Sequence, residues 1–330
     1  MSRSPRGIRD SAELREALAA VGVISPGYTG SLEVVRIGAG FGLSGVTARV
    51  VVEEAPRRAV VVKRDAAETI RREQLFYTRG ALALGSSVPG YLGALVDGDT
   101  GLLVLEDVAP ARSLDVLAGC DDATAERLVA TLAVLHASTW SGSDPTRTDP
   151  ALPRWRCRAC TAGEWAVRLG MARRRFPDLL DDEATDVLMA LPGRVTQVLD
   201  RLAGGPQCWI HADAHLDNVL RRPDGTVVLL DWATSCSGPP LVDLAQLLAG
   251  GLVNDPVSQR TRTAALVQAY TDTLTDHGVT DAGSSAAAVA EAALPWVQGI
   301  VGWAAAPELP AGRAGDVLRA QLAVALAWAR

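Results

Sequence analysis

The chain has 330 residues, of which 48% are hydrophobic and 21% are charged, and its net charge at pH 7 is −6. This composition is typical of a folded globular protein with about two domains and excludes an intrinsically disordered chain. The negative charge disfavours nucleic acid as a partner, because binding to a phosphate backbone requires a basic face.

The N-terminus and the cysteines bear on the cellular compartment. The first ten residues carry three arginines and no apolar run, which does not fit a secretory signal. No stretch reaches the roughly 18 uncharged apolar residues that a membrane span needs. Five scattered cysteines are typical of free thiols in a reducing compartment. We therefore expect a cytoplasmic protein that needs neither a membrane nor an obligate protein partner.

The first hundred or so residues have the pattern of a small antiparallel sheet with one main helix. Apolar residues alternate with polar ones in the strand segments, and the third strand is expected to end at Lys63. The strand pair near residue 100 turns at Asp97-Gly98. The expected elements, in chain order, are a helix over 11–21, strands over 32–37, 46–52 and 59–63, a helix over 66–83 and two strands within 91–106.

After Pro110 the pattern becomes mainly helical, interrupted by one small β hairpin that turns at Pro223-Asp-Gly225. The fold class expected from this order is α+β. We expect an N-terminal nucleotide-binding lobe, 1–107, and a C-terminal catalytic and acceptor-binding lobe, 108–330. The helices are expected over 121–140, 160–175, 182–203, 239–251, 256–277, 283–303 and 311–330, and the strands over 208–210, 219–220 and 227–230.

Lysine is almost absent from this chain. Of the 32 basic residues, Lys63 alone is a lysine. A lysine ammonium is a compact, movable charge, whereas an arginine guanidinium is wide and planar. A lone lysine among arginines therefore indicates a position that arginine fills poorly, with chance survival as the alternative.

The segment His211-Ala-Asp-Ala-His-Leu-Asp-Asn218 carries the clearest chemistry. Asp213 and Asn218 have the spacing H-x-D-x-x-x-x-N of a phosphoryl-transfer loop, which needs a proton acceptor and oxygen ligands for magnesium. Asp231 follows the hairpin and is a second candidate magnesium ligand. We expect Asp213 to be catalytic, Asn218 and Asp231 to bind Mg²⁺, and His211 to support the loop.

Two metal-binding alternatives stay open at this point. His211, Asp213 and His215 alternate in a pattern that also occurs among metal ligands. Cys157 and Cys160 form a C-x-x-C pair, which would need two further ligands to hold zinc.

The glycine-rich turn is weak evidence by itself. Gly40-Phe41-Gly42-Leu-Ser44-Gly45 satisfies G-x-G-x-x-G, and Asp65 stands where a dinucleotide-binding fold would place its acidic residue. That alternative requires a helix after the third glycine, yet β-branched residues follow. We therefore expect a hairpin turn that covers phosphates, with Lys63 on a following strand.

A phosphate-holding lysine needs a carboxylate that orients it. Glu73, in the helix after the lysine strand, is the favoured partner, and Glu68 is the alternative. The adenine is expected to bond to the backbone around Glu106 to Val108.

Taken together, these stretches resemble the aminoglycoside phosphotransferase and choline kinase-like family over essentially the whole chain. The resemblance implies the two-lobed protein-kinase-like fold, Lys63 with Glu73 as the phosphate-holding pair, and Asp243 as the residue that braces the catalytic loop. Ala212 and Ala233 depart from the family pattern, which often has glycine and an acidic residue there. The matching stretches are 72–77, 104–107, 132–140, 209–220, 230–232 and 238–245.

The expected reaction is transfer of a phosphoryl group from ATP, with GTP as the alternative, to a small-molecule hydroxyl with Mg²⁺. The acceptor is an antibiotic or a metabolite such as a choline-like or sugar-like alcohol; an inert nucleotide-binding pseudokinase is the non-enzymatic alternative. Trp296 and Trp303 are either core residues or part of a site for a quaternary ammonium. The arginines within 154–175 are either a solvated helical face or a patch for an anionic substrate.

Overall fold

The computed structural model describes residues 8–38, 45–54, 56–142, 150–252, 256–280 and 282–330, with the backbone alone at 256–260. The chain divides into two compact units. The first comprises Met1–Arg112 with Arg222–Ser235, and the second Ser113–Arg221 with Cys236–Arg330. Residues 222–235 thus belong to the first compact unit, and the predicted roles of 1–107 and 108–330 stay predictions.

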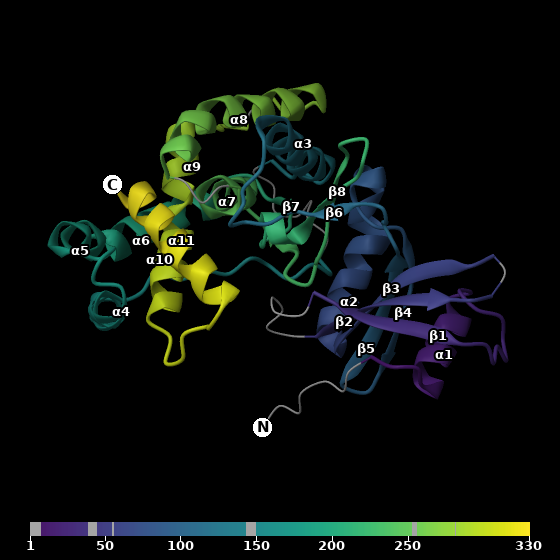
Figure 1. Ribbon diagram of the computed structural model, residues 1–330. Helices are drawn as coiled ribbons and strands as arrows, with labels where there is room; N and C mark the ends of the chain where they lie inside the picture. Colours follow the sequence, from purple (N-terminus) through teal and green to yellow (C-terminus); the bar gives the residue numbers. More distant parts are fainter. Residues whose placement is uncertain (1–7, 39–44, 55, 143–149, 253–255, 281) are drawn as a thin grey trace. The chain divides into compact units, whose positions relative to one another are not determined.

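The first unit is built on a five-stranded antiparallel sheet with the strand order β1-β2-β3-β5-β4 (Figure 1). The strands predicted here are confirmed, but the third continues past Lys63 to Ala66. Its elements are α1 (Ala12–Ala20), β1 (Leu32–Ile37), β2 (Val46–Val52), β3 (Arg58–Ala66), α2 (Ala67–Leu75), β4 (Tyr91–Asp97), β5 (Thr100–Glu106) and β9 (Val227–Leu229), with α2 continuing into the π-helical turn η1 (Phe76–Gly80) and the 3₁₀ turns η2 (Ala81–Ala83) and η3 (Gly85–Ser87).

Alternation along β3 decides which way Lys63 faces. Val60 and Val62 are buried in an apolar cluster that includes Leu14 and Leu18 of α1. Because successive side chains of a strand point to opposite faces, Lys63 lies on the other face of the sheet. Helix α2 packs against that face, and a Cβ at Gly101 of β5 would lie 3.2 Å from Ile70 of α2.

The second unit is mainly helical, as predicted. Its helices are α3 (Asp122–Ser138), α4 (Ala162–Arg175), α5 (Asp182–Met189), α6 (Leu191–Ala203), α7 (Pro240–Gln246) with its π-helical continuation η6 (Leu247–Gly251), α8 (Pro256–Asp276), α9 (Ala286–Ala292), α10 (Leu294–Ala304) and α11 (Arg313–Ala329). Its short strands are β7 (Cys208–Ile210), β8 (Val219–Arg221) and β10 (Cys236–Gly238), and the two-residue strand β6 (Arg112–Ser113) spans the boundary with the first unit.

Two predicted helices are each broken in the structure. The segment 182–203 divides into α5 and α6, and 283–303 divides into α9 and α10. Pro192 and Pro295 stand in the first turn of the second helix of each pair. Proline lacks the N–H that a helix interior needs but fits the first turn, so each proline sets a new helix start.

Strand β10 is absent from the prediction. It pairs antiparallel with β7, with Ser237 opposite Trp209. Three residues containing serine and glycine carry too little strand signal to be recognised from sequence. None of the described helices combines the length and apolar character required to cross a membrane.

Candidate active site

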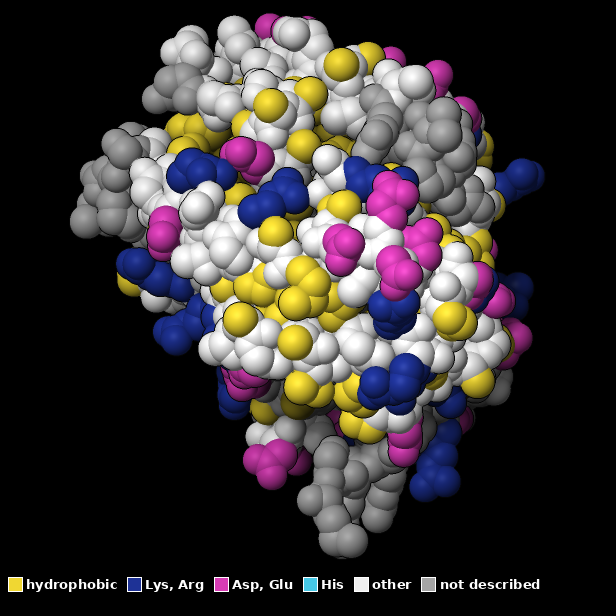
Figure 2. Space-filling model, turned by 90° about the vertical axis from the view of Figure 1, so that its left-hand side faces the viewer, with side chains coloured by type: hydrophobic (Ala, Val, Ile, Leu, Met, Phe, Trp, Pro, Cys, Tyr) yellow, Lys and Arg dark blue, Asp and Glu magenta, His cyan; other side chains and the backbone are white. Residues whose placement is uncertain are grey.

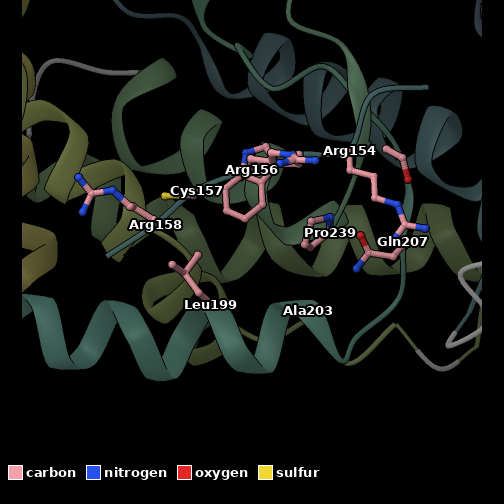
Figure 3. A pocket seen from close by; sticks show the side chains of 10 residues that line it. Arg154, Arg156, Cys157, Arg158, Leu199, Ala203, Gln207 and Pro239 are labelled. Atoms are coloured by element: carbon pink, nitrogen blue, oxygen red, sulfur yellow. The ribbon is translucent and has the colours of Figure 1, made fainter. Parts of the chain in front are cut away.

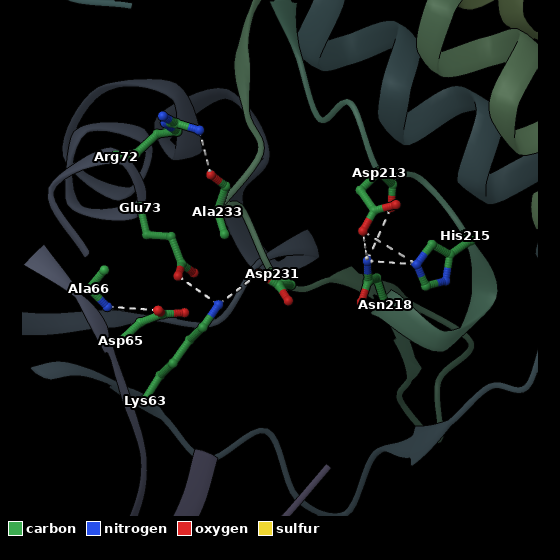
Figure 4. Close-up of polar contacts among 10 residues, drawn as sticks. All are labelled: Lys63, Asp65, Ala66, Arg72, Glu73, Asp213, His215, Asn218, Asp231 and Ala233. Atoms are coloured by element: carbon green, nitrogen blue, oxygen red, sulfur yellow. Dashed lines mark hydrogen bonds and ion pairs between the residues drawn. The ribbon is translucent and has the colours of Figure 1, made fainter. Parts of the chain in front are cut away.

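Lys63 is the centre of a charged cluster in the first unit (Figure 4). Its Nζ lies 2.7 Å from Glu73 Oε1 and 2.7 Å from Asp231 Oδ1. Strand β3 presents the lysine, α2 presents Glu73, and Asp231 follows β9. Glu73, rather than the alternative Glu68, is therefore the helix carboxylate that contacts the lysine; Glu68 pairs with Arg72.

Burial and neighbouring charges have opposite effects on the pKa of the Lys63 ammonium. The Lys63 side chain is only 12% exposed, and Glu73 is buried at 1%. Burial alone would lower the pKa of the Lys63 ammonium, but the charges of Glu73 and Asp231 outweigh it and hold that pKa above its ordinary value. The group is therefore a permanent cation at neutral pH.

The backbone at Asp231 is held by its neighbours in the first unit. Asp231 has a φ of 58°, a left-handed conformation that aspartate tolerates better than most residues. The next residue, Trp232, is fully buried and stacks on Phe76 with ring centroids 3.5 Å apart. Arg72 of α2 donates a 3.0 Å hydrogen bond to the carbonyl of Ala233. These contacts fix the direction in which the Asp231 carboxylate points.

The predicted catalytic loop follows β7 in the second unit. His211 is fully buried, and Ala212 has a φ of 61°. A non-glycine residue in this conformation costs about 1–2 kcal/mol. Asp243 offsets that cost, because its carboxylate accepts hydrogen bonds from the backbone N–H of His211 (2.6 Å) and Ala212 (2.7 Å).

Asp243 is itself held by a buried chain of polar groups. His136 Nε2 lies 3.2 Å from Asp243 Oδ2, and His136 Nδ1 lies 2.7 Å from the hydroxyl of Tyr270. Asp243 and His136 are fully buried. Asp243 therefore contacts the loop in the manner that the bracing role requires, while the roles of Asp243 and His211 in turnover stay proposals.

Asp213 lies among three polar side chains of the second unit. Asn218 Nδ2 is 3.3 Å from Asp213 Oδ2, His215 Nε2 is 3.5 Å from the same oxygen, and Gln246 Nε2 is 3.2 Å from Oδ1. Burial alone would raise the pKa of the Asp213 carboxyl, but hydrogen bonding and charge from His215, with His211 and Asn218, hold it below its ordinary value. The carboxylate is ionised at neutral pH, as a proton acceptor must be.

Asn218 and Asp231 have the atoms that magnesium prefers. Asn218 Nδ2 also lies 3.0 Å from the carbonyl of Asp213, so its amide oxygen is the atom available to a cation. The described residues contain no group of three or more His, Cys, Asp or Glu side chains able to hold a metal ion by themselves. A carboxylate and an amide oxygen are the kinds of protein ligand that Mg²⁺ takes when phosphate oxygens and water complete its shell.

The structure describes only some of the other residues that were predicted to contact the nucleotide. Gly40, Phe41, Gly42 and Ser44 lie outside the described residues. Gly45 is described, with a φ of +82°, and a Cβ there would lie 2.9 Å from the carbonyl of Arg64. At the end of β5, Glu106 is exposed and Val108 is buried.

Two contacts at the loop escaped the sequence-based prediction. Gln246 stands three residues after Asp243 on α7, so both reach the loop from one helix face. Arg313, at the start of α11, donates to both oxygens of Asp217 at 3.0 and 2.8 Å and pairs with Asp115 at 2.7 Å. The helical spacing from Asp243 could have indicated Gln246. No local pattern could have linked Arg313 to Asp217, a residue 96 positions earlier.

The α+β, protein-kinase-like fold predicted from the sequence is confirmed by solved structures of similar fold. A Ralstonia eutropha protein assigned as an aminoglycoside phosphotransferase is 17% identical, with a TM-score of 0.58 over 97% of this chain and 98% of that chain. A macrolide 2′-phosphotransferase from Brachybacterium faecium is 15% identical, with a TM-score of 0.52 over 88% and 90%. The choline kinase LicA from Streptococcus pneumoniae is 17% identical, with a TM-score of 0.51 over 95% and 97%.

The sequence also matches the model of a protein family. The model of the phosphotransferase enzyme family matches residues 40–282, and the chain belongs to that family. Among curated proteins, none matches this sequence closely enough to count as a relative.

Proposed function

We propose that this protein transfers the γ-phosphoryl group of ATP to a hydroxyl of a small molecule. The observation that carries the proposal is the position of Lys63, the lone lysine of the chain, whose Nζ lies 2.7 Å from both Glu73 and Asp231. Phosphoryl transfer depends on positioning and charge stabilisation, and a charged lysine oriented by a buried carboxylate supplies both to a triphosphate. GTP is the alternative donor.

The proposed roles divide between the two clusters. Lys63 binds the phosphates, Glu73 orients Lys63, and Asp231 and Asn218 would hold Mg²⁺. When bound, Mg²⁺ neutralises phosphate charge. Asp213 orients the acceptor hydroxyl and takes its proton late, as the oxygen–phosphorus bond forms and the bond from the γ-phosphorus to the β–γ bridging oxygen breaks. ADP leaves, and the proton passes from Asp213 to solvent.

A catalytically inert nucleotide-binding module is the main non-enzymatic alternative. Such a module would be expected to lack at least one catalytic group, whereas Lys63, Asp213, Asn218 and Asp231 are all present. Thermal shift tests which nucleotide binds: a protein with this site is stabilised by ATP with Mg²⁺ and not by NAD, because only a ligand that binds the folded state raises Tm. An inert module that binds ATP would respond in the same way, so turnover distinguishes it from a kinase.

Formation of ADP over a panel of hydroxylated compounds tests the reaction. Proteins of similar fold include a macrolide 2′-phosphotransferase and a choline kinase, so the panel spans antibiotics and metabolite alcohols. At least one alcohol should accelerate ADP formation over the rate with water alone. Acceptor-independent nucleotide binding, with no alcohol accelerating ADP formation, would contradict the proposal.

A further inference from the structure

The second unit contains a pocket of about 730 Å³ that none of the proposed catalytic roles uses (Figure 3). Figure 3 shows Leu199 and Ala203 on α6 along one side of the pocket and the arginine-bearing segment 154–158 along the other. Gln207, Ser237 and Pro239 also line it. A cavity of this size suits a small organic ligand.

The lining combines positive charge with an apolar floor. Arg154, Arg156 and Arg158 contribute guanidinium groups, while the described part of the lining includes no aspartate or glutamate. Trp155, Leu199, Ala203 and Pro239 provide the apolar contact area. Such a lining disfavours an ammonium ligand and favours a molecule with both an oxyanion and an apolar body.

The arginines of this region do not all behave alike. Arg158 is engaged by Glu164, with both guanidinium nitrogens 2.8 Å from its carboxylate oxygens, and Arg173 pairs with Asp182. No described carboxylate pairs with Arg154 or Arg156, and both side chains are exposed. The solvated-face interpretation thus fits Arg158 and Arg173, whereas Arg154 and Arg156 are left to bind an anion.

Side chains of opposite charge also lie near one another elsewhere on the surface. On the face shown in Figure 2, basic and acidic side chains lie interspersed with apolar ones, so its described part carries no large area of one sign. The pocket departs from that mixture, because two of its arginines have no carboxylate partner among the described residues and its described lining includes no carboxylate.

The pocket and the catalytic loop belong to the same unit and contact one small apolar cluster. Trp155 N–H donates to the carbonyl of Ser237 (2.7 Å), so segment 153–155 lies beside β10. Trp155 and Ala212 pack against one small cluster, Cys208, Ile210 and Cys236, and Ala212 directly precedes Asp213.

Chain geometry limits how far the two sites lie apart. Ser237 of the pocket pairs with Trp209 across the ladder, and Asp213 is four residues beyond Trp209. Four residues of fully extended chain span at most about 14 Å. This upper limit allows one molecule to place an anionic group against the arginines and a hydroxyl at Asp213, provided that the molecule extends along β7 from Gln207, which is six residues before Asp213.

We propose that Arg154 and Arg156 bind the carboxylate or phosphate group of the acceptor, which makes the acceptor an organic anion with an apolar body and a free hydroxyl. This assignment rests on the proposed phosphotransferase function and narrows its substrate class. Trp155 and Leu199 contact the apolar body, and the arginines act on binding rather than on the chemical step.

The test uses a matched series of hydroxymethyl arenes that differ in one substituent: carboxylate, phosphate monoester, primary amide or ammonium. Calorimetric titration of the full chain with ADP and Mg²⁺ should show binding of the two anions in preference to the amide and the ammonium compound. The carboxylate and phosphate arms identify which oxyanion is preferred. Equal affinity for all four compounds, or preference for the ammonium compound, would overturn the proposal.

Two variants with the same type of substitution locate the binding. Arg154→Gln with Arg156→Gln should weaken anion binding by roughly tenfold or more, because charge-assisted hydrogen bonds are lost. Arg174→Gln, an exposed residue of α4 outside the pocket lining, is the control and should bind as the parent does. Equal affinities for the double variant and the control would overturn the proposal.

Turnover separates this inference from the proposed function. With an anionic alcohol that the parent protein phosphorylates, the double variant should show a raised KM and an unchanged kcat. Phosphorylation of an alcohol with the same KM in the double variant and the parent would overturn the anion assignment and leave the phosphotransferase function standing. An anion that binds through both arginines but is never phosphorylated would overturn its role as acceptor. The phosphotransferase function itself fails only if no alcohol of the wider panel promotes ADP formation.

Discussion

The ammonium nitrogen of Lys63 lies 2.7 Å from a carboxylate oxygen of Asp231, although the two residues are 168 positions apart in the chain. The sheet places the lysine on the face that α2 covers, and the segment after β9 supplies the aspartate. Glu73 is buried at 1%, whereas Asp231 is 44% exposed. The buried carboxylate is therefore suited to orienting the lysine and the exposed one to ligating a cation.

Lys63→Arg should weaken nucleotide binding although the charge is kept. A guanidinium is too wide to occupy the position of an Nζ that lies 2.7 Å from two carboxylates. We expect KM for ATP to rise by about tenfold or more, which corresponds to about 1.4 kcal/mol. Steady-state kinetics with varied ATP provide the measurement, with Asp200→Asn on the exposed face of α6 as a control. Unchanged ATP kinetics in Lys63→Arg would remove the lysine from the site.

Trp232→Ala should destabilise the first unit and loosen Asp231. The indole is fully buried against Phe76, so its removal leaves a cavity that typically costs about 3–5 kcal/mol. Denaturant unfolding measures the loss, and the Mg²⁺ dependence of turnover reports on Asp231. Leu82→Ala, at a side chain that is 82% exposed, should leave both values near those of the parent. A Trp232→Ala protein as stable as Leu82→Ala would contradict this account.

Asp243→Asn should lower stability and activity together. The two carboxylate oxygens accept from the N–H groups of His211 and Ala212, and an asparagine would turn an NH₂ donor toward one of them. One buried unsatisfied donor costs about 1–3 kcal/mol. Thermal unfolding should show a lower Tm than the control Asp276→Asn, whose side chain is exposed at the end of α8. Equal Tm values would show that the loop does not depend on this brace.

His215→Ala should move the acidic limb of the pH–rate profile to higher pH. The pKa of Asp213 lies below its ordinary value partly because of His215. In the proposed mechanism, the basic form of Asp213 is the active one. Activity is therefore present above that pKa and lost as pH falls through it. Without His215 the pKa rises, so activity is lost at a higher pH than in the parent.

The matched control for this profile is His277→Ala, because His277 is exposed at the end of α8. The profile of kcat/KM against pH reports groups of the free enzyme. Coincident acidic limbs for His215→Ala and His277→Ala would show that His215 does not set the pKa of Asp213.

Local patterns allowed much of the fold to be predicted. Alternation of apolar and polar residues located the strand that carries Lys63, because side-chain burial in a half-buried sheet repeats every two residues. The same patterns missed the helix breaks, although Pro192 and Pro295 were visible in the sequence, since the apolar spacing continues across both prolines. Strand β10 was missed because its three residues carry no repeat of their own.

Contacts at the candidate site were predictable where spacing within one loop encodes them. Asp213 and Asn218 stand five residues apart and lie 3.3 Å from each other through Asp213 Oδ2 and Asn218 Nδ2. Arg313 reaches Asp217 only because α11 packs back on the loop, which no local pattern records. The pocket beside Arg154 likewise depends on α6 and β10, far from the arginines in sequence.

The most direct test of the account follows phosphorus from ATP to an alcohol. The parent protein, incubated with ATP, Mg²⁺ and an acceptor from the panel, should form a phosphate ester that is visible by phosphorus NMR alongside ADP. Asp213→Ala should form it about 10²–10⁴-fold more slowly, because a group that orients the hydroxyl and accepts its proton is lost. Ester formation by Asp213→Ala at the parent rate would contradict the central claim.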